Sequence, residues 1–433
     1  MEGVNLYSWG MYPKIKNRHF SFKDLKELSS YMRDSFSYIP YGNGRSYGDA
    51  CLNDCILYCK PYNFLLDFDT QNGIIHCQSG VLLAEIIKIT IPRGWFLKIT
   101  PGTKYITVGG AIASDVHGKN HHIDGCFSES LLEFRLMLPS GEVIQCKKGD
   151  ELFHATCGGM GLTGVIIAAR IQLKKIKSKN IRRIIIKTKN LTETFECFEK
   201  YASSTYSVAW VDCLTKGKNI GRSIFTIGEF IEDGDLNYKE KKKLNIPFTF
   251  PGFILNRFTV KAFNYFYYHK FQNDIFEEIV DIDNFFYPLD SINYWNRIYG
   301  KNGFLQYHLV IPRKEGYTGI EEILWKVARY EGGCFLGVLK FYGKENNNLL
   351  SFPLEGYGLA LDFKINKGVF ELLNELDKIV VKYGGRIYLA KDARMSRETF
   401  EAGYHNFQKF KEVRKKYELY KKFQSLQSRR LEI

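Results

Sequence analysis

The chain has 433 residues, of which 45% are hydrophobic and 25% charged, a composition that excludes a disordered or disulfide-dense protein. This length exceeds one ordinary hydrophobic core, so we expect two domains. The 61 basic and 47 acidic residues give a net charge of +14, which favours an anionic partner or surface.

The first part of the chain, residues 1 to about 175, alternates short apolar runs with glycine-rich turns, a pattern typical of a mixed α+β domain. We expect strands at 55–57, 64–68, 74–77, 132–138 and 165–171, and helices at 23–34 and 81–90. The stretch 173–179 is basic and polar, and it indicates a domain boundary.

The second part has the pattern of a sheet covered by helices. Strands are expected at 183–187, 207–212, 305–311 and 337–342, and helices at 193–201, 320–331 and 369–382. Gly384 and Gly385 end the last helix, and a strand at 386–389 returns toward the first domain. That return matters because it carries Lys391.

A glycine-rich segment at residues 41–49, called here the first glycine loop, has the chemistry of an anion site. Gly42, Gly44 and Gly48 lack a Cβ and adopt positive φ easily, so nearby backbone amides can converge on a diphosphate. No Gly-Lys-Ser/Thr tripeptide follows, which excludes a Walker loop. The third glycine comes one position too late for a Rossmann fingerprint, and residues 50–66 predict turn and strand rather than helix.

Two further segments repeat this chemistry. Residues 99–102 predict a turn, 105–108 a short strand, and 109–113 a run of small residues against which a flat ring can lie. Residues 156–164 supply four more glycines before the strand at 165–171. Each segment alone fits an ordinary turn, but their order and spacing together indicate a flavin site.

These segments give the chain its resemblance to the vanillyl-alcohol-oxidase-type (PCMH-type) FAD oxidoreductases, and within them to the decaprenylphosphoryl-β-D-ribose 2′-oxidases. The matching stretches are 44–53, 108–122, 158–164, 288–290, 295–297, 303–307 and 389–392. The resemblance implies an α+β, two-domain fold. It places an FAD-binding domain at 1–175, an antiparallel-sheet substrate domain covered by helices at 176–385, and a C-terminal return to the FAD domain at 386–433.

Oxidation of an alcohol by a flavin needs a hydride acceptor, a base and positive charge near the flavin. The resemblance implies that Lys391 stabilises the reduced flavin and orients or deprotonates the substrate hydroxyl, and that His117 lies beside the isoalloxazine. The implied FAD contacts are Gly42, Asn43, Gly44, Arg45, Ser46, Tyr47, Gly48, Pro101, Gly102, Gly109, Gly110, Ala113, Ser114, His117, Gly118, Asn120, Gly164, Val165, Ile166 and Tyr388. The implied substrate contacts are Tyr47, Lys119, Gln306, His308, Lys340 and Lys391, with Lys340 a partner for phosphate.

Four positions depart from the family pattern. Arg45 stands where many of these flavoenzymes carry a histidine bonded to the flavin, so we expect noncovalent FAD. Ala360, His308 and Phe286 stand where the mycobacterial enzymes have cysteine, glutamine and tyrosine. The altered pocket leaves the identity of the sugar open.

The resemblance implies oxidation of the 2′-hydroxyl of a polyprenylphosphoryl-β-D-ribofuranose to the 2′-keto sugar, the first half of an epimerisation to arabinose for cell wall biosynthesis. Its implied partners are a quinone or other electron acceptor and a separate NAD(P)H-dependent ketoreductase. An alditol or sugar-lactone oxidase that uses oxygen and acts on another sugar alcohol is the alternative enzyme. A basic lipid- or nucleic-acid-binding protein without chemistry is the alternative from another class.

Other ligands are disfavoured by the pattern. The basic residues are dispersed apart from the tail at 409–430 and form no nucleic-acid-binding motif, so we expect no nucleic-acid partner. His117, His121 and His122 lack an acidic or cysteine partner at helical spacing, so we expect no metal. The ten cysteines are scattered, as in a reduced cytosolic protein.

The location of the protein follows from two features. Residues 1–16 lack the apolar core of a signal peptide, and the chain has no apolar run of about eighteen residues, so we expect a cytoplasmic protein. The aromatic segment 246–271, with Arg257, Lys261 and Lys270, is typical of a membrane-contacting or lid segment, and equally of a buried helical hairpin. If this segment contacts a membrane, the positive net charge favours a peripheral location at the inner face of an anionic membrane.

Overall fold

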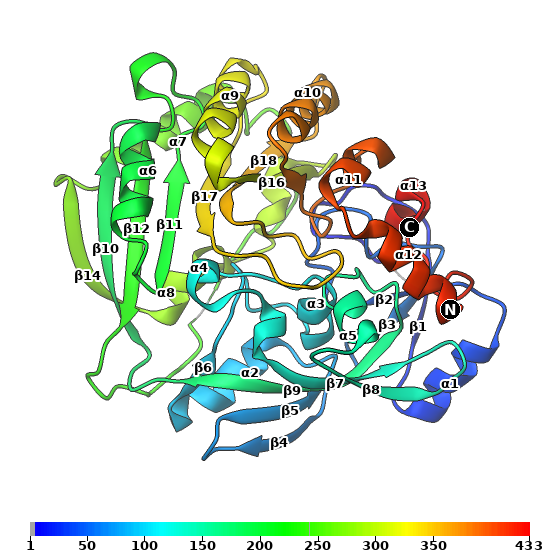
Figure 1. Cartoon of the computed structure of the whole chain (residues 1–433). Helices are drawn as coiled ribbons and strands as arrows, with labels where there is room; N and C mark the ends of the chain where they lie inside the picture. The colour runs from blue at the N-terminus through cyan, green and yellow to red at the C-terminus, as the bar shows by residue number, and fades with distance from the viewer. Residues whose placement is uncertain (1–4, 242) are drawn as a thin grey trace.

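The computed structural model describes residues 5–241 and 243–433, so the first four residues of the expected domain 1–175 lie outside the described residues. The first part of the chain builds two sheets below the second part in Figure 1. One sheet has the order β4 (Leu65–Asp69), β5 (Ile74–Gln78), β9 (Val165–Lys175), β7 (Leu131–Met137) and β8 (Val143–Lys147), with β6 (Trp95–Leu97) paired to β9. The other is parallel, with the order β1 (Arg18–Ser21), β3 (Cys55–Tyr58) and β2 (Ile39–Tyr41).

The helices of the first part are short and lie around these sheets. They are α1 (Leu25–Arg33), α2 (Leu83–Thr90), α3 (Val108–Ala113), α4 (His121–Asp124) and α5 (Glu151–Thr156). Asp24 caps α1 by accepting bonds from the amides of Lys26 and Glu27, which is why this helix starts where it does.

The second part is one antiparallel sheet of eight strands. Its order is β14 (Ile275–Asp281), β10 (Asn180–Thr188), β12 (Ser223–Phe230), β11 (Tyr206–Val211), β17 (Leu336–Tyr342), β18 (Gly356–Lys364), β16 (Phe304–Pro312) and β19 (Arg386–Ile387). A short parallel pair, β13 (Leu244–Asn245) and β15 (Ile292–Asn293), lies apart from it. Together with the mixed first part, this sheet confirms the expected α+β fold class.

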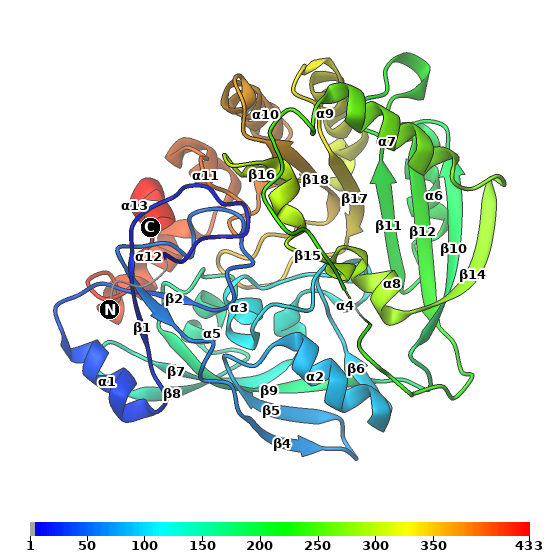
Figure 2. The same ribbon diagram turned by 180° about the vertical axis from the view of Figure 1, so that it is seen from behind.

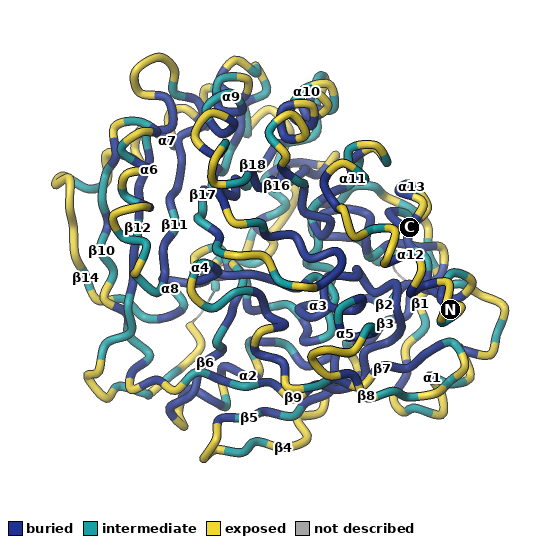
Figure 3. The backbone as a smooth tube through the Cα atoms, viewed as in Figure 1, coloured by how far each residue is buried: buried dark blue, intermediate teal, exposed yellow. Residues whose placement is uncertain are grey.

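Helices cover both faces of the large sheet. On one face lie α6 (Leu191–Lys200), α9 (Gly316–Arg329) and α10 (Val369–Lys382), and α8 (Ile282–Phe286) follows β14. On the other, α7 (Arg257–His269) lies across the strands, as Figure 2 shows, with Tyr267 packed on Trp210 at a ring distance of 4.7 Å. In Figure 3 the central strands β11, β16 and β18 are largely dark blue, whereas the edge strand β14 and the outer turns of the helices are largely yellow, so the core lies between the middle of the sheet and its helices.

The C-terminal segment returns to the first part of the chain. Its helices are α11 (Arg397–Gly403), α12 (Phe407–Lys416) and α13 (Leu426–Leu431). In Figures 1 and 2, α12 and α13 lie on the side of β1 to β3, whereas α11 lies against β19 and α10. A parallel bridge joins Tyr38 to Phe423, and the guanidinium of Arg429 donates to Asn53 Oδ1 at 2.8 Å.

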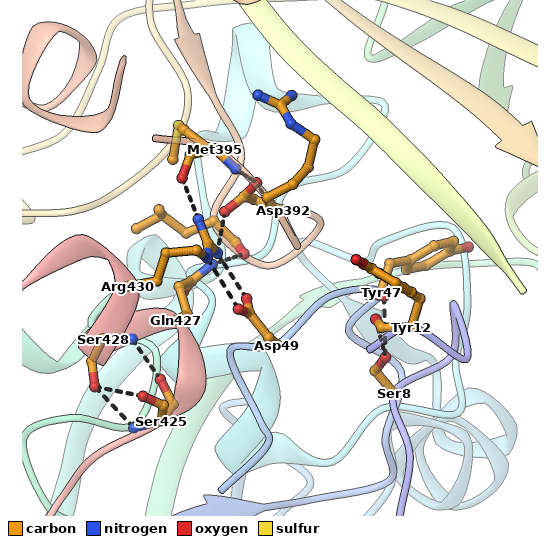
Figure 4. Close-up of polar contacts among 12 residues, drawn as sticks. Ser8, Tyr12, Tyr47, Asp49, Asp392, Met395, Ser425, Gln427, Ser428 and Arg430 are labelled. Carbon is orange, nitrogen blue, oxygen red and sulfur yellow. Dashed lines mark hydrogen bonds and ion pairs between the residues drawn. The ribbon is translucent and has the colours of Figure 1, made fainter. Parts of the chain in front are cut away.

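A buried ion cluster fixes this return to the first glycine loop. Figure 4 shows Arg430 of α13 between two carboxylates, with its Nη2 2.9 Å from Asp49 Oδ1 and 2.8 Å from Asp392 Oδ2. The Arg430 guanidinium also donates to the Met395 carbonyl. Asp49 ends the glycine loop and Asp392 follows Lys391, so one guanidinium holds both segments.

The structure corrects three expectations. The strand expected at 386–389 to return toward the first domain is β19, which is two residues long and pairs with β16 at the edge of the large sheet. Residues 105–108 do not form a strand: Thr107 caps a helix, α3, by accepting a bond from the Gly110 amide at 3.1 Å. Gly109 lets that helix approach Ser79 closely, because a Cβ on Gly109 would lie 3.0 Å from the Ser79 Cβ. The aromatic segment 246–271 is likewise not a hairpin, because it holds the single helix α7 with many exposed rings.

We expect the Arg430 cluster to dominate the stability of the C-terminal segment. Arg430→Met removes the charge between two buried carboxylates, so the free energy of unfolding should fall by about 3–5 kcal/mol at pH 8. Without the guanidinium the pKa of both carboxyls rises, so protonation favours the folded variant and its deficit should shrink as the pH falls toward 5. Denaturant unfolding at several pH values measures both effects.

Arg397→Met is the matched control for this prediction. Arg397 forms an exposed ion pair with Glu401, and such pairs contribute about 0–1 kcal/mol. If both variants lost the same free energy of unfolding, the Arg430 cluster would not be the dominant contribution to the stability of the C-terminal segment.

Candidate active site

A cavity of about 720 Å³ lies between the first part of the chain and the large sheet. Its wall contains the first glycine loop, α3, the turn that carries Lys391, and one face of the eight-stranded sheet. Its volume is within the range of about 300–1,000 Å³ that is usual for cofactor and ligand pockets.

The first glycine loop presents unpaired donors to this cavity. Gly44 has φ +60°, and the amides of residues 43–46 find no acceptor among the residues that the structure describes. The Arg45 guanidinium stacks on Trp9 at 3.9 Å, and its Nε is buried without a partner. Ser79 Oγ, across the cavity, is also buried and unpartnered. Such a set of orphaned donors fits the diphosphate of FAD.

Most of the expected cofactor residues line the cavity. They are Gly42, Asn43, Gly44, Arg45, Ser46, Tyr47, Pro101, Gly102, Gly109, Gly110, Ala113, Ser114, His117, Gly164, Ile166 and Tyr388. Tyr388 is fixed by its hydroxyl, which donates to the Ser114 carbonyl at 2.8 Å, and the Asn43 amide donates to the Tyr105 carbonyl at 2.7 Å.

Four expected cofactor residues do not line the cavity. Gly48 packs so closely that a Cβ would lie 1.6 Å from the Asp392 carbonyl oxygen, and Gly118 lies against the Thr100 backbone. The Asn120 amide donates to the Lys98 carbonyl at 2.9 Å, and Val165 is fully buried in the core. These four residues pack against other parts of the protein behind the cavity wall.

The expected substrate residues of the sheet share one face because side chains alternate along a strand. Gln306 and His308 of β16 lie opposite Asp362 and Ala360 of β18, and Lys340 of β17 projects to the same side. Tyr47, Lys119 and Lys391 line the cavity from the first part of the chain and the C-terminal return. The fold therefore brings all six expected substrate residues into one cavity.

Three lysines line the cavity and are half-buried. Burial lowers the pKa of Lys391 to about 7 and that of Lys340 to about 8. Burial, together with the charge of Lys340, lowers the pKa of Lys119 to about 7. Lys119 donates to the Phe285 carbonyl, and Lys391 Nζ lies 3.8 Å from the centre of the Tyr47 ring. The Nζ atoms of Lys340 and Lys391 have no carboxylate within ion-pair distance among the described residues.

Two histidines of the cavity are joined through one hydroxyl. Tyr342 Oη lies 2.9 Å from His117 Nε2 and 3.1 Å from His308 Nε2. Burial, with the charge of Lys340 added, holds the pKa of both imidazoles well below its usual range, so both are neutral. In the described ranges, no three His, Cys, Asp or Glu side chains are grouped to hold a metal ion.

Two cavity carboxylates were missed by the sequence reasoning. Asp290 accepts from the Thr103 hydroxyl at 2.7 Å and the Lys104 amide at 2.8 Å, at the end near Arg45. Asp362 accepts from Gln306 and Tyr299. Asp362 stands two residues after Ala360 on the same strand, so the alternation of β18 was the signal that could have found it.

Comparisons with known proteins agree with this cavity. A family model described as an FAD binding domain matches residues 21–147. The decaprenylphosphoryl-β-D-ribose oxidase of Mycolicibacterium smegmatis is 33% identical over 411 residues, which cover 91% of this chain and 89% of the relative. An uncharacterised protein of Streptomyces coelicolor is 28% identical over 353 residues, 77% of this chain and 95% of its own. The L-gulonolactone oxidase of Bos taurus is 24% identical over 181 residues, 40% of each chain. These matches confirm FAD as the cofactor and an FAD-dependent oxidoreductase as the class of enzyme.

We expect the FAD to be held without a covalent bond. The Arg45 side chain, stacked on Trp9, offers no nucleophile to the flavin. Cys126, a thiol that follows the His117 to His122 segment, is buried outside the cavity lining. Acid precipitation should therefore release all the yellow cofactor into the supernatant. Flavin that stays with the pellet and comigrates with a tryptic peptide would contradict this.

Proposed function

Because the chain belongs to the decaprenylphosphoryl-β-D-ribose oxidase family, we propose that it oxidises the 2′-hydroxyl of a polyprenylphosphoryl-β-D-ribofuranose to the 2′-keto sugar. The bound FAD supplies the hydride acceptor for this reaction. The product is the intermediate of an epimerisation to the arabinose form.

One observation carries this proposal: the cavity holds lysine ammonium groups that lack a carboxylate partner. Lys340 and Lys391 are half-buried on the cavity wall, and each has a lowered pKa because its charge is poorly solvated there. A phosphate brought into the cavity would satisfy Lys340 with charge-assisted hydrogen bonds. A neutral polyol would leave that charge uncompensated, so the site favours a phosphorylated substrate.

Lys391 and His117, at the sugar end of the cavity, have different roles in the proposed reaction. Lys391, with a pKa of about 7, is in part a neutral amine at physiological pH and accepts the proton of the sugar hydroxyl. In its charged form it stabilises the negative charge that two-electron reduction brings to the site. His117 is neutral and tied to Tyr342, so it contributes shape and hydrogen bonding rather than charge.

The other end of the cavity is largely apolar, with Arg183 and Thr226 as polar exceptions, and suits a lipid chain. It is lined by Val208, Trp210, Ile224, Phe263, Tyr267, Phe335, Leu336 and Val338. An alditol or sugar-lactone oxidase, the alternative supported by the partial match to L-gulonolactone oxidase, has no need of such a surface. A polyprenyl tail leaving the sugar end would lie along it.

The reaction implies two partners. The electrons must leave to a quinone or another acceptor, and the keto sugar must be reduced by a separate NAD(P)H-dependent ketoreductase to complete the epimerisation. Both are chemical requirements of the proposed reaction.

Anaerobic mixing of the flavoprotein with candidate substrates tests the reaction. A polyprenylphosphoryl ribose should bleach the visible absorbance of the oxidised flavin, and alditols, sugar lactones and ribose without phosphate should not. Bleaching by free polyols at equal or greater rates would favour the alternative oxidase.

We further propose that α7 docks the protein on an anionic membrane. Its outer face exposes Phe258 and Phe266, which are 85% and 72% solvent-accessible, and the preceding loop exposes Phe253 at 78%. Its inner face, through Phe263 and Tyr267, lines the apolar end of the cavity. One helix therefore connects the surface to the lipid end of the site, and the net charge of +14 supplies the attraction. Within the described ranges, no helix is both long and apolar enough to cross a bilayer.

Loss of Lys391 should remove the proton acceptor. Lys391→Met should retain FAD but slow substrate-driven bleaching by about a hundredfold or more, the usual contribution of a general base. In the native protein the bleaching rate should rise with pH and level off above a pKa of about 7, because only the neutral amine accepts a proton. In the variant that rise should disappear.

Lys367→Met, at an exposed lysine before α10, is the control and should leave rate and pH profile unchanged. A native pH profile in Lys391→Met would remove this lysine from the proposed role.

Membrane docking should depend on the aromatic surface and on charge. Co-sedimentation with liposomes should require anionic lipid, weaken with salt, and fall when Phe253, Ile254 and Phe258 are changed to Ser, with FAD retained. The control changes Phe64, Leu65 and Leu66 to Ser, an exposed apolar run on the first part of the chain. Binding that ignores lipid charge, or that both triple variants lose equally, would refute the assignment to α7.

A further inference from the structure

Asp362 is a cavity carboxylate to which the proposed reaction assigns no role. It lies on β18 directly opposite Gln306 of β16, is 1% exposed, and lines the sugar end of the cavity. Its Oδ1 accepts from the Gln306 amide at 2.7 Å, and its Oδ2 accepts from the Tyr299 hydroxyl at 3.2 Å. Both oxygens of a buried carboxylate are therefore engaged on the wall where the substrate hydroxyl must lie.

The first consequence concerns the orientation of Gln306. An ionised carboxylate only accepts hydrogen bonds, so the Gln306 side chain must turn its NH₂ group toward Asp362. Its carbonyl oxygen then points away from Asp362, toward the part of the cavity where the Tyr47 hydroxyl lies near the Gln306 side chain. Because Gln306 lines the cavity, that oxygen is available to accept a bond from a sugar hydroxyl.

The second consequence concerns the charge of Lys391. Burial lowers the pKa of Lys391, the charge of Asp362 opposes this, and the charge of Lys340 adds to it. The other titratable groups that face Lys391 are His117 and His308, both neutral, and Tyr47, whose ring lies under Nζ. Asp362 is thus the one negative charge found to raise the pKa of Lys391 within the described chain.

We propose that Asp362 is a positioning residue for the sugar end of the site: it turns the Gln306 oxygen toward the substrate hydroxyl and supplies the negative charge that faces Lys391. The part that concerns the sugar rests on the proposed function, and the part that concerns Lys391 does not. The two parts have separate readouts.

The test uses Asp362→Asn in the FAD-loaded protein, a change that keeps shape and removes charge. The pH dependence of acetylation of Lys391 by acetic anhydride, followed by peptide mass spectrometry, reports the pKa of this lysine without substrate. The midpoint should lie near 7 in the native protein and fall by about one unit in Asp362→Asn, because an attractive charge has been lost. With substrate, KM should rise about tenfold, since the Gln306 amide is free to rotate away from the sugar.

Asp377→Asn is the matched control. Asp377 is also a buried carboxylate bonded to a tyrosine hydroxyl, that of Tyr307 at 2.9 Å, but it is outside the cavity lining. Its variant should leave the midpoint and KM unchanged. If Asp362→Asn does not fold, Tyr299→Phe removes one donor from the same carboxylate and should lower the midpoint in the same direction by less.

An unchanged midpoint in Asp362→Asn, or an equal shift in Asp377→Asn, would overturn the electrostatic role. A shifted midpoint with an unchanged KM would overturn the orienting role of Asp362 toward Gln306. If the midpoint shifts and no phosphorylated sugar reduces the flavin, the proposed function fails while the Lys391 part of the inference stands.

Discussion

The site depends on one half-buried guanidinium between two buried carboxylates. Arg430, near the end of the chain, binds Asp49 at the end of the first glycine loop and Asp392 beside Lys391. Burial opposes ionisation of both carboxyls and, with the charge of Asp392, raises the pKa of Asp49 to about 6, whereas Arg430 and two backbone amides hold the pKa of Asp392 below its usual range. The cluster therefore fixes the position of the first glycine loop relative to the turn that carries Lys391. A preorganised active site requires that its cofactor-binding and reacting groups be held in such fixed positions.

The large sheet supplies the opposite wall by simple alternation. Because every second residue of a strand points to the same face, β16, β17 and β18 place Gln306, Lys340 and Asp362 in the cavity without any special loop. The same face becomes largely apolar toward β11 and β12. The wall therefore has a polar end at β16 to β18 and a lipid-compatible end at β11 and β12. A phosphorylated sugar on a lipid has this order of groups.

Much of the fold could be predicted from the sequence, since apolar periodicity marks helices such as α10, whose expected range 369–382 coincides with the observed one. The glycines at 109–110 misled the assignment of α3, because Gly109 serves close packing of a helix against Ser79 rather than a turn. Gly48 and Asn120 were expected at the cofactor, but each binds or packs against the protein behind the wall. The alternation of β18 could place Asp362 on the same face as Ala360, but its bond to Gln306 depends on the cross-strand register, which the sequence of one strand does not give.

The most direct measurement of the central claim is a position-specific isotope effect on flavin reduction. Polyprenylphosphoryl ribose is prepared with deuterium at C2′, or at C3′ as a control, and mixed anaerobically with the enzyme. If the 2′-hydroxyl is oxidised at this site, deuterium at C2′ should slow bleaching severalfold and deuterium at C3′ should leave it unchanged. An isotope effect at C3′, or none at C2′ when the chemical step limits the rate, would contradict the account.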